Sequence, residues 1–128
     1  MSVSQKLKRF MSNYTETSDD HPVAELKSRY YKSTNSQVYQ VVEAMLSRHE
    51  LYQVTSVSAE RGEISANLRS PKKAFLVATV ISIRPFETAV DFNVTTETTL
   101  PTDFGYSQKI VLSLYEELDK LLPRIDRS

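Results

Sequence analysis

Two stretches of the chain repeat hydrophobic residues with the spacing of an α-helix. In residues 36–50 and 110–122, hydrophobic side chains recur every three or four positions, which places them on one helix face. Thr34, Asn35 and Ser36 precede or open the first stretch and can cap its first turn. The pattern therefore predicts two amphipathic helices. Their hydrophobic faces consist of Val38, Val41, Val42, Met45 and Leu46 in the first and Ile110, Leu114, Leu118, Leu121 and Leu122 in the second.

Five further stretches have the pattern of β-strands. They are rich in β-branched residues, and several alternate hydrophobic and polar positions. Turn residues separate the last four stretches, with Gly62 in the first turn and Pro71 and Pro85 in the next two. We therefore expect these four strands to form an antiparallel meander. The five predicted strands cover residues 26–33, 52–60, 63–70, 74–84 and 88–98.

The predicted order of elements is β-α-β-β-β-β-α. Two amphipathic helices can cover one face of such a sheet, which predicts a two-layer α+β fold with a curved antiparallel sheet. This order resembles the TATA-binding-protein-like and helix-grip architectures, in which a curved sheet wraps a long C-terminal helix. The resemblance concerns the order of elements and implies no function. A length of 128 residues favours one domain, here residues 26–128.

Residues 1–25 differ from the rest of the chain and are predicted to be a flexible N-terminal segment. Leu7, Phe10, Met11 and Tyr14 recur at helical spacing, so a short amphipathic helix is one possibility. Such a helix could dock on the domain or on another surface, and a loose tail is the alternative. The residues from 15 to 22 are rich in Ser, Thr and Asp and are expected to act as a linker.

The strongest predicted strand, residues 74–84, is hydrophobic on both of its faces. This pattern suggests that both faces are covered. The second cover could be the N-terminal segment, a partner chain or a ligand. Alternatively, the small alanines leave one face only mildly hydrophobic, which needs no cover. One face carries Phe75, Val77, Ile81 and Ile83, and the other carries Leu76, Ala78 and Val80.

The segment between the last strand and the second helix contains Asp103-Phe104-Gly105, a tripeptide that binds magnesium in protein kinases. The glycine-rich loop and the other kinase motifs are missing, so the match is due to chance. Thr102 or Asp103 is instead expected to cap the second helix. Phe104 is expected to pack inward. Gly105 is unusual in a first helical turn and suggests a close contact.

The composition excludes several kinds of chemistry. The chain has no Cys and two His, so thiol catalysis and Cys-ligated metals are excluded. It has two glycines, which excludes phosphate-binding glycine loops. We expect no cofactor and no metal. Carboxylates near Asp91 and Asp103 leave an enzyme as a third hypothesis, ranked behind two binding functions. An exposed polar strand face is the preferred explanation of Asp91.

Charge and hydrophobicity also limit the partners and the location. Sixteen basic residues balance sixteen acidic ones, which argues against nucleic acid despite the basic and aromatic Lys27, Arg29 and Tyr31. No signal peptide is evident, and the longest hydrophobic run is too short to span a bilayer. We therefore expect a cytoplasmic protein.

The residues around the second junction show a family resemblance. The chain has Val90-Asp91-Phe92 in the last long strand, Thr102-Asp103-Phe104-Gly105 at the junction and Lys109-Ile110 on the helix. These motifs and the order of elements resemble the bacterial domain-of-unknown-function family fourteen-ninety-nine over residues 26–122. Residues 93–97 depart from the Arg/Ser run of that family, and the spacing to Lys109 differs by one residue. The resemblance implies no established activity.

These observations favour a small non-enzymatic binding domain. It would use the sheet face opposite the helices to form a homodimer or to bind a protein partner. The alternative is a helix-grip carrier that encloses a small apolar ligand between the sheet and the C-terminal helix. The residues predicted to form the interaction or ligand face are Tyr30, Tyr31, Leu76, Val80 and Phe86.

Overall fold

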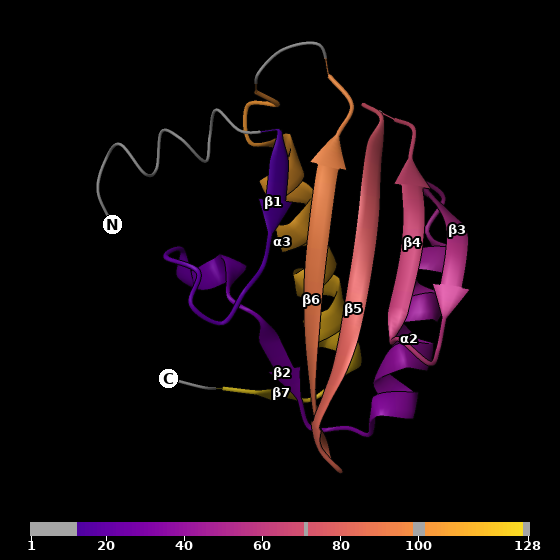
Figure 1. Cartoon of the computed structure of the whole chain (residues 1–128), viewed down its shortest axis with the longest axis vertical. Helices are drawn as coiled ribbons and strands as arrows, with labels where there is room; N and C mark the ends of the chain where they lie inside the picture. The colour runs from indigo at the N-terminus through magenta and orange to yellow at the C-terminus, as the bar shows by residue number, and fades with distance from the viewer. Residues whose placement is uncertain (1–12, 71, 99–101, 127–128) are drawn as a thin grey trace.

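The structure, a computed structural model, describes residues 13–70, 72–98 and 102–126. Within these ranges the chain forms an α+β fold, and the predicted order of its major elements is confirmed, with short strands added near both ends (Figure 1). The elements are β1 (Tyr14–Glu16), the 3₁₀ helix η1 (Ala24–Leu26), β2 (Arg29–Tyr31), α2 (Asn35–Arg48), β3 (Tyr52–Ser58), β4 (Glu63–Leu68), β5 (Ala74–Arg84), β6 (Glu87–Thr96), α3 (Tyr106–Leu121) and β7 (Arg124–Ile125).

The described strands form one antiparallel sheet. Strands β3 to β6 pair in chain order as the predicted meander, and the sheet continues through β2 to β7. Both helices lie on the same side of this sheet, behind it in the view of Figure 1. We call the sheet face toward the helices the inner face and the opposite one the outer face. The two-layer prediction is therefore confirmed.

Strands β1 and β2 share one edge of β6 and act as two pieces of an interrupted strand. Tyr14 in β1 pairs with Thr95, whereas Arg29 in β2 pairs with Val90. The chain between them turns away through η1 and is held by a bridge from Ser18 to Lys27. The prediction of a linker at residues 15–22 is therefore wrong at its start, because three-residue strands are too short to leave a pattern. The predicted N-terminal helix lies mostly outside the described residues.

The hydrophobic core fills the space between the inner face and the two helices. Strand β5 contributes the even-numbered residues from Ala74 to Val80, and β6 contributes Val90, Phe92 and Val94. Helix α3 contributes the predicted stripe, although Leu121 is exposed. The largest fully buried side chains are Tyr31, Tyr115, Phe92, Leu26, Leu46, Ile64, Leu76, Leu114, Leu118, Val38, Val42 and Val90.

Both glycines take left-handed backbone conformations at tight junctions. Gly62 has φ +68° in the β3–β4 turn, and its carbonyl accepts a 2.7 Å hydrogen bond from the Val80 amide. A Cβ atom at Gly62 would lie 2.2 Å from the Val80 carbonyl oxygen, so the turn has no space for a side chain. Gly105 has φ +84° directly before α3. Because residues other than glycine rarely adopt such angles, both positions favour glycine.

The N-termini of the two helices are capped in different ways. The Thr34 hydroxyl accepts a 3.2 Å hydrogen bond from the Gln37 amide, which is the predicted cap of α2. At α3, Gly105 takes the N-cap position and the carboxylate of Asp103 reaches past it to the first helical turn. Phe104 has φ +56° and is exposed, so the prediction that it packs inward is wrong.

Candidate functional site

The residues predicted to form the interaction face lie mostly in the core. Tyr31, Leu76 and Val80 are 0%, 1% and 3% exposed, and Tyr30 is also buried. The side chains of Leu76 and Val80 point to the inner face, toward the helices, so they cannot contact a partner of the folded chain. Phe86, at 67% exposed, remains accessible. The sequence indicated correctly that β5 is hydrophobic on both faces. The face predicted to contact a partner, which carries Leu76 and Val80, is the one that the helices bury.

The outer face of β5 is the exposed hydrophobic surface of the sheet. Phe75, Ile81 and Ile83 are 46%, 42% and 43% exposed, and Val77 is half-buried. This row is one strand wide, because the paired positions on β4 and β6 are largely polar. Beside Phe75 and Val77 lie Asn67 and Ser65 on β4 and Thr95 and Asn93 on β6. We call Phe75, Val77, Ile81 and Ile83 the outer stripe.

The hydrophobic surface is most accessible where β5 and β6 turn. Strand β4 pairs with β5 only as far as Thr79, whereas Ile81, Ser82 and Arg84 pair with β6 on the other side, with a register shift at residue 83. The β5–β6 hairpin consequently extends past the end of β4 (Figure 1). We call its exposed side chains Ile81, Ile83 and Phe86 the hairpin tip. In the described strands, residues 81–84 therefore combine hydrophobic side chains with a backbone edge that no other strand pairs.

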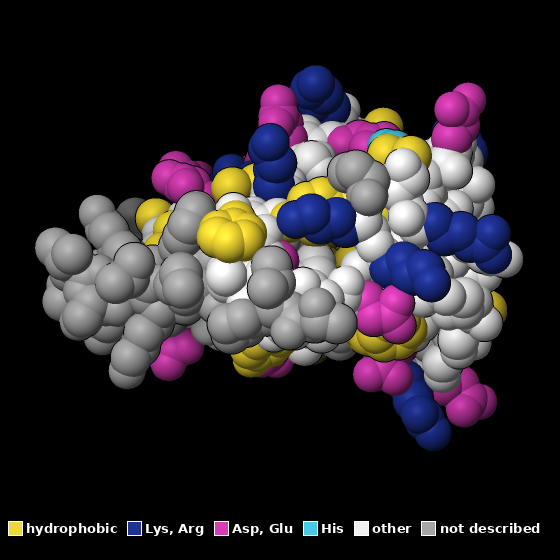
Figure 2. Space-filling model, turned by 90° about the horizontal axis from the view of Figure 1, so that it is seen from above, with side chains coloured by type: hydrophobic (Ala, Val, Ile, Leu, Met, Phe, Trp, Pro, Cys, Tyr) yellow, Lys and Arg dark blue, Asp and Glu magenta, His cyan; other side chains and the backbone are white. Residues whose placement is uncertain are grey.

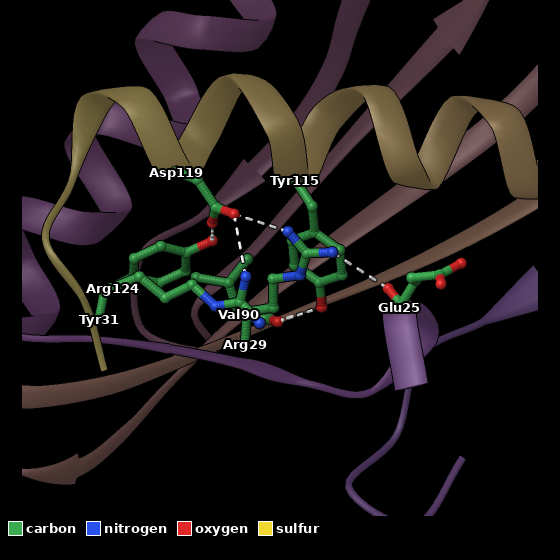
Figure 3. Close-up of polar contacts among 7 residues, drawn as sticks. All are labelled: Glu25, Arg29, Tyr31, Val90, Tyr115, Asp119 and Arg124. Atoms are coloured by element: carbon green, nitrogen blue, oxygen red, sulfur yellow. Dashed lines mark hydrogen bonds and ion pairs between the residues drawn. The ribbon is translucent and has the colours of Figure 1, made fainter. Parts of the chain in front are cut away.

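A second notable cluster is polar and lies between β2 and α3 (Figure 3). The Arg29 guanidinium forms a 2.7 Å ion pair with Asp119, and Arg124 reaches the same carboxylate at 3.2 Å. The Tyr31 hydroxyl donates a 2.7 Å hydrogen bond to the other oxygen of Asp119. Burial and this hydrogen bond raise the pKa of Tyr31 well above its ordinary value. The cluster attaches the edge strand to the helix.

The Arg29 side chain also covers an aromatic ring. Its guanidinium carbon lies 4.4 Å from the ring centre of Tyr115, and the Tyr115 hydroxyl donates a 2.6 Å hydrogen bond to the Val90 carbonyl. Burial raises the pKa of Tyr115 as well. Among the described residues, the buried Arg29 Nε atom has no hydrogen-bond partner. With an aromatic face on one side and Asp119 on the other, the guanidinium is well placed for a structural role.

The two carboxylates considered for catalysis have structural contacts. Asp91 accepts hydrogen bonds from the hydroxyls of Ser28 and Thr17, which fill the gap between β1 and β2. Asp103 accepts hydrogen bonds from the Thr96 hydroxyl and from three backbone amides at the start of α3. The structure does not bring these residues into one cluster with a histidine. Among the described residues, no group of three or more His, Asp or Glu side chains could hold a metal ion.

The prediction that Thr102 or Asp103 caps α3 agrees with the contacts at the junction. The Asp103 carboxylate accepts hydrogen bonds of 3.0 to 3.2 Å from the amides of Gly105, Tyr106 and Ser107. It does so although Asp103 lies two residues before the N-cap. The Thr102 hydroxyl accepts a 3.0 Å hydrogen bond from the Phe104 amide. The first amides of a helix have no partner within the helix, so Asp103 supplies one.

A carrier of this architecture would hold its ligand between the inner face and α3. In the part of the chain that the structure describes, buried side chains such as Phe92, Leu114 and Leu118 occupy this space. The larger hollows open at the surface instead. One of about 1090 Å³ lies between α2 and α3 beside Val41, Met45 and Leu121, and one of about 620 Å³ lies beside β2 and β7 near Tyr30 and Arg124.

Charged side chains of both signs occur on the face of the molecule that Figure 2 shows. In the view of Figure 2, Lys and Arg alternate with Asp and Glu around small hydrophobic patches among the residues that are coloured. Among the described residues, no helix has both the length and the hydrophobicity that crossing a membrane requires.

The fold defines a helix-grip-like α+β protein, in which a curved antiparallel sheet covers a C-terminal helix. A solved structure described as a START superfamily protein from Mycobacterium smegmatis superimposes with a TM-score of 0.51 over 84% of this chain and 98% of that one. The two chains are 11% identical, so this likeness shows the fold alone. No family model matches the chain, and no curated protein matches it significantly. The resemblance to family fourteen-ninety-nine therefore gains no support, whereas the helix-grip resemblance is confirmed.

Proposed function

We propose that this protein is a non-enzymatic binding domain that associates with a second copy of itself through the hairpin tip. The observation that carries the proposal is the exposure of Ile81, Ile83 and Phe86 on a hairpin that extends beyond the neighbouring strand. Clustered exposed hydrophobic side chains are a feature of protein-binding surfaces. A hairpin edge with unpaired backbone groups can also extend a sheet into a partner.

A two-fold arrangement satisfies both features at once. In a symmetric dimer the same surface lies on both subunits, so residues 81–84 of two copies could pair antiparallel across the axis. Each pairing would also bring the isoleucines of one copy toward those of the other. The tip is much smaller than the roughly 800 Å² per partner of a stable interface. We therefore expect a weak dimer, with a dissociation constant on the order of micromolar or higher.

Sedimentation velocity over a concentration series tests this proposal. The wild-type chain should change from monomer to dimer as its concentration rises, and the double variant Ile83→Ser/Phe86→Ser should remain monomeric. The matched control is Leu51→Ser/Leu121→Ser, which removes two exposed leucines beside the groove between α2 and α3 and should dimerise like the wild type. A wild-type chain that stays monomeric, or a tip variant that still dimerises, would contradict the proposal.

A carrier of a small apolar ligand is the second candidate function, and the helix-grip-like fold favours it. Buried side chains fill the space between β6 and α3. A ligand could enter this space only if α3 or its side chains moved. The groove between α2 and α3 offers another place for a ligand, at the surface. This candidate predicts a non-covalent ligand that stays with the chain through purification.

A further inference from the structure

A hollow of about 370 Å³ lies at the end of β4, β5 and β6, far from the hairpin tip. Its volume falls in the range of roughly 300–1,000 Å³ that is usual for small-molecule sites. Its lining combines an exposed aromatic ring, two cations and one carboxylate, which come from three neighbouring strands. We call it the strand-end hollow.

Phe75, the first residue of the outer stripe, supplies the aromatic ring. It is 46% exposed, so a large part of its side chain is accessible to a ligand. Asn67 on β4 and Thr95 on β6 are paired with it in register and flank it on the outer face. Both neighbours line the hollow and can form hydrogen bonds. An accessible aromatic side chain between polar neighbours suits the stacking of a planar base.

Arg69 and Lys73 supply the two cations, from the two sides of the β4–β5 turn. They lie one residue beyond the last pair of this hairpin, which joins Leu68 to Ala74. Among the described residues, no carboxylate forms an ion pair with either side chain. Arg and Lys are the residues that bind phosphate groups, Arg through two parallel hydrogen bonds and Lys as a point charge.

The cations are held in place by contacts with the surrounding strands and with α3. The Arg69 guanidinium donates a 3.1 Å hydrogen bond to the Gln53 side chain on β3, and the Lys73 carbonyl accepts one of 2.8 Å from the Glu97 amide. The Tyr106 hydroxyl, at the start of α3, lies 3.4 Å from the backbone amide and carbonyl of Lys72 in the turn. Binding therefore costs less entropy than it would on a loose turn.

Glu97 gives the strand-end hollow a negative side. It lies on the β6 side of the hollow, opposite the cation of β4. A carboxylate accepts hydrogen bonds from hydroxyl groups. The lining therefore favours a ligand that has an anionic group, a planar ring and hydroxyl donors, and a mononucleotide has all three as its phosphate, base and ribose.

The surface next to the hollow limits the length of such a ligand. A second hollow of about 300 Å³ lies further along the outer face, around Val77 and Thr79, with Glu16, Glu63 and Asp91 in its lining. No Lys or Arg is among the described residues that line it. The phosphates of a longer strand that continued along the sheet would be repelled there.

We propose that the strand-end hollow binds a single nucleotide, with its base on Phe75, its phosphate at Arg69 and Lys73 and its ribose hydroxyls toward Glu97. This inference does not depend on the proposed function, because the strand-end hollow and the hairpin tip lie at opposite ends of β5.

Titration of the ¹⁵N-labelled chain with adenosine monophosphate tests the proposal by NMR. The amide signals of Lys73, Phe75 and Thr95 should shift saturably at millimolar nucleotide. Adenosine and ribose 5-phosphate should each bind at least about tenfold more weakly, because each lacks one of the two main contacts. Absence of saturable shifts, or equal affinity for either fragment, would overturn the proposal.

Variants separate a built site from general attraction of an anion. Arg69→Gln/Lys73→Gln should weaken binding of adenosine monophosphate at least tenfold, whereas the matched control Arg61→Gln/Lys120→Gln, which removes two exposed cations elsewhere, should bind like the wild type. Equal weakening in both variants would overturn the proposal.

Phe75→Ala tests the stacking contact. It should weaken binding of adenosine monophosphate by roughly fivefold or more and leave the weak binding of ribose 5-phosphate unchanged. An unchanged affinity for the nucleotide would overturn the placement of the base.

Two further titrations define the ligand and separate the two proposals. A single-stranded octanucleotide should bind no more than about tenfold tighter than the mononucleotide, and a larger gain would overturn the restriction to a single nucleotide. The variant Ile83→Ser/Phe86→Ser should bind adenosine monophosphate like the wild type even if it abolishes self-association, so the two proposals can fail separately.

Discussion

Asp103 is a single residue on which the junction between sheet and helix depends. It is 2% exposed, and it bonds three backbone amides of the first turn and a hydroxyl on β6. A carboxylate at the N-terminus of a helix is also favoured by the helix dipole. Gly105, two residues further on, is explained by the same contacts. Its left-handed conformation lets the chain turn so that the Asp103 carboxylate can reach the amides of the first helical turn.

Replacement of Asp103 by Ala should lower the free energy of unfolding by roughly 2–3 kcal/mol, because buried amides lose their acceptor. Thr102→Ala, which removes the acceptor of the Phe104 amide, should cost about 1 kcal/mol or less. Urea unfolding followed by circular dichroism measures both. Equal stability of Asp103→Ala and the wild type would contradict the structural role of this carboxylate.

The buried tyrosines predict how stability depends on pH. Burial and the bond to Asp119 raise the pKa of Tyr31 above its ordinary value of 10.0. Below that value both the folded and the unfolded chain keep the proton. Above it, the unfolded chain loses the proton while the folded chain retains it, so stability falls as pH rises. Tyr31→Phe should reduce the slope of this fall by about 1.4 kcal/mol per pH unit.

Urea titrations at several values above pH 10 measure this slope for the wild type and for Tyr31→Phe. The variant should be less stable near neutral pH, because it lacks the hydrogen bond to Asp119, and the difference should narrow in alkali. Parallel curves for the two proteins would show that the Tyr31 hydroxyl does not titrate differently in the folded state.

At the scale of elements, the edge strand β2 depends on α3 for its position. Strand β2 is three residues long, and its inner-face side chains Arg29 and Tyr31 both end on Asp119. Short edge strands are weakly held by backbone bonds alone. The polar cluster therefore compensates for the shortness of the strand. Strand β7 also pairs with β2, on the edge of β2 that faces away from β6.

Asp119→Ala should lower the free energy of unfolding by about 3 kcal/mol, because it leaves the largely buried Arg29 guanidinium without its counter-charge. Arg124→Ala removes the more exposed partner of the same carboxylate and should cost less than about 1 kcal/mol. Thermal and urea unfolding of both variants give the comparison. If the two substitutions cost the same, the Arg29–Asp119 pair does not hold the edge strand.

At the scale of the whole molecule, periodicity in the sequence predicted the long elements and their order. The helical stripes of α2 and α3 and the alternation in β4 and β6 are local signals, so they could be recognised without the structure. The short strands β1 and β7 left no such signal. The buried face of β5 could not be chosen from the sequence, because both faces are hydrophobic and only the packing of the helices distinguishes them.

The polar cluster was missed for a similar reason. Arg29 and Asp119 are 90 positions apart. The sequence pattern around Arg29 indicated only a nucleic-acid contact, which the balanced charge of the chain argues against. A usable signal was present in α3, where Tyr115 and Asp119 lie one turn apart beside the hydrophobic stripe. Polar side chains on the buried side of a helix need hydrogen-bond or ionic partners. Which strand supplies these partners depends on the order of the strands in the sheet, which the local sequence does not reveal.

Native mass spectrometry of the chain purified from cells tests the central claim most directly, because one spectrum reports both self-association and any retained ligand. The account predicts masses of the bare chain and of its dimer, with the dimer lost in Ile83→Ser/Phe86→Ser and kept in Leu51→Ser/Leu121→Ser. A monomer that carries a non-covalent small molecule, both in the wild type and in Ile83→Ser/Phe86→Ser, would contradict self-association through the hairpin tip and would favour a carrier.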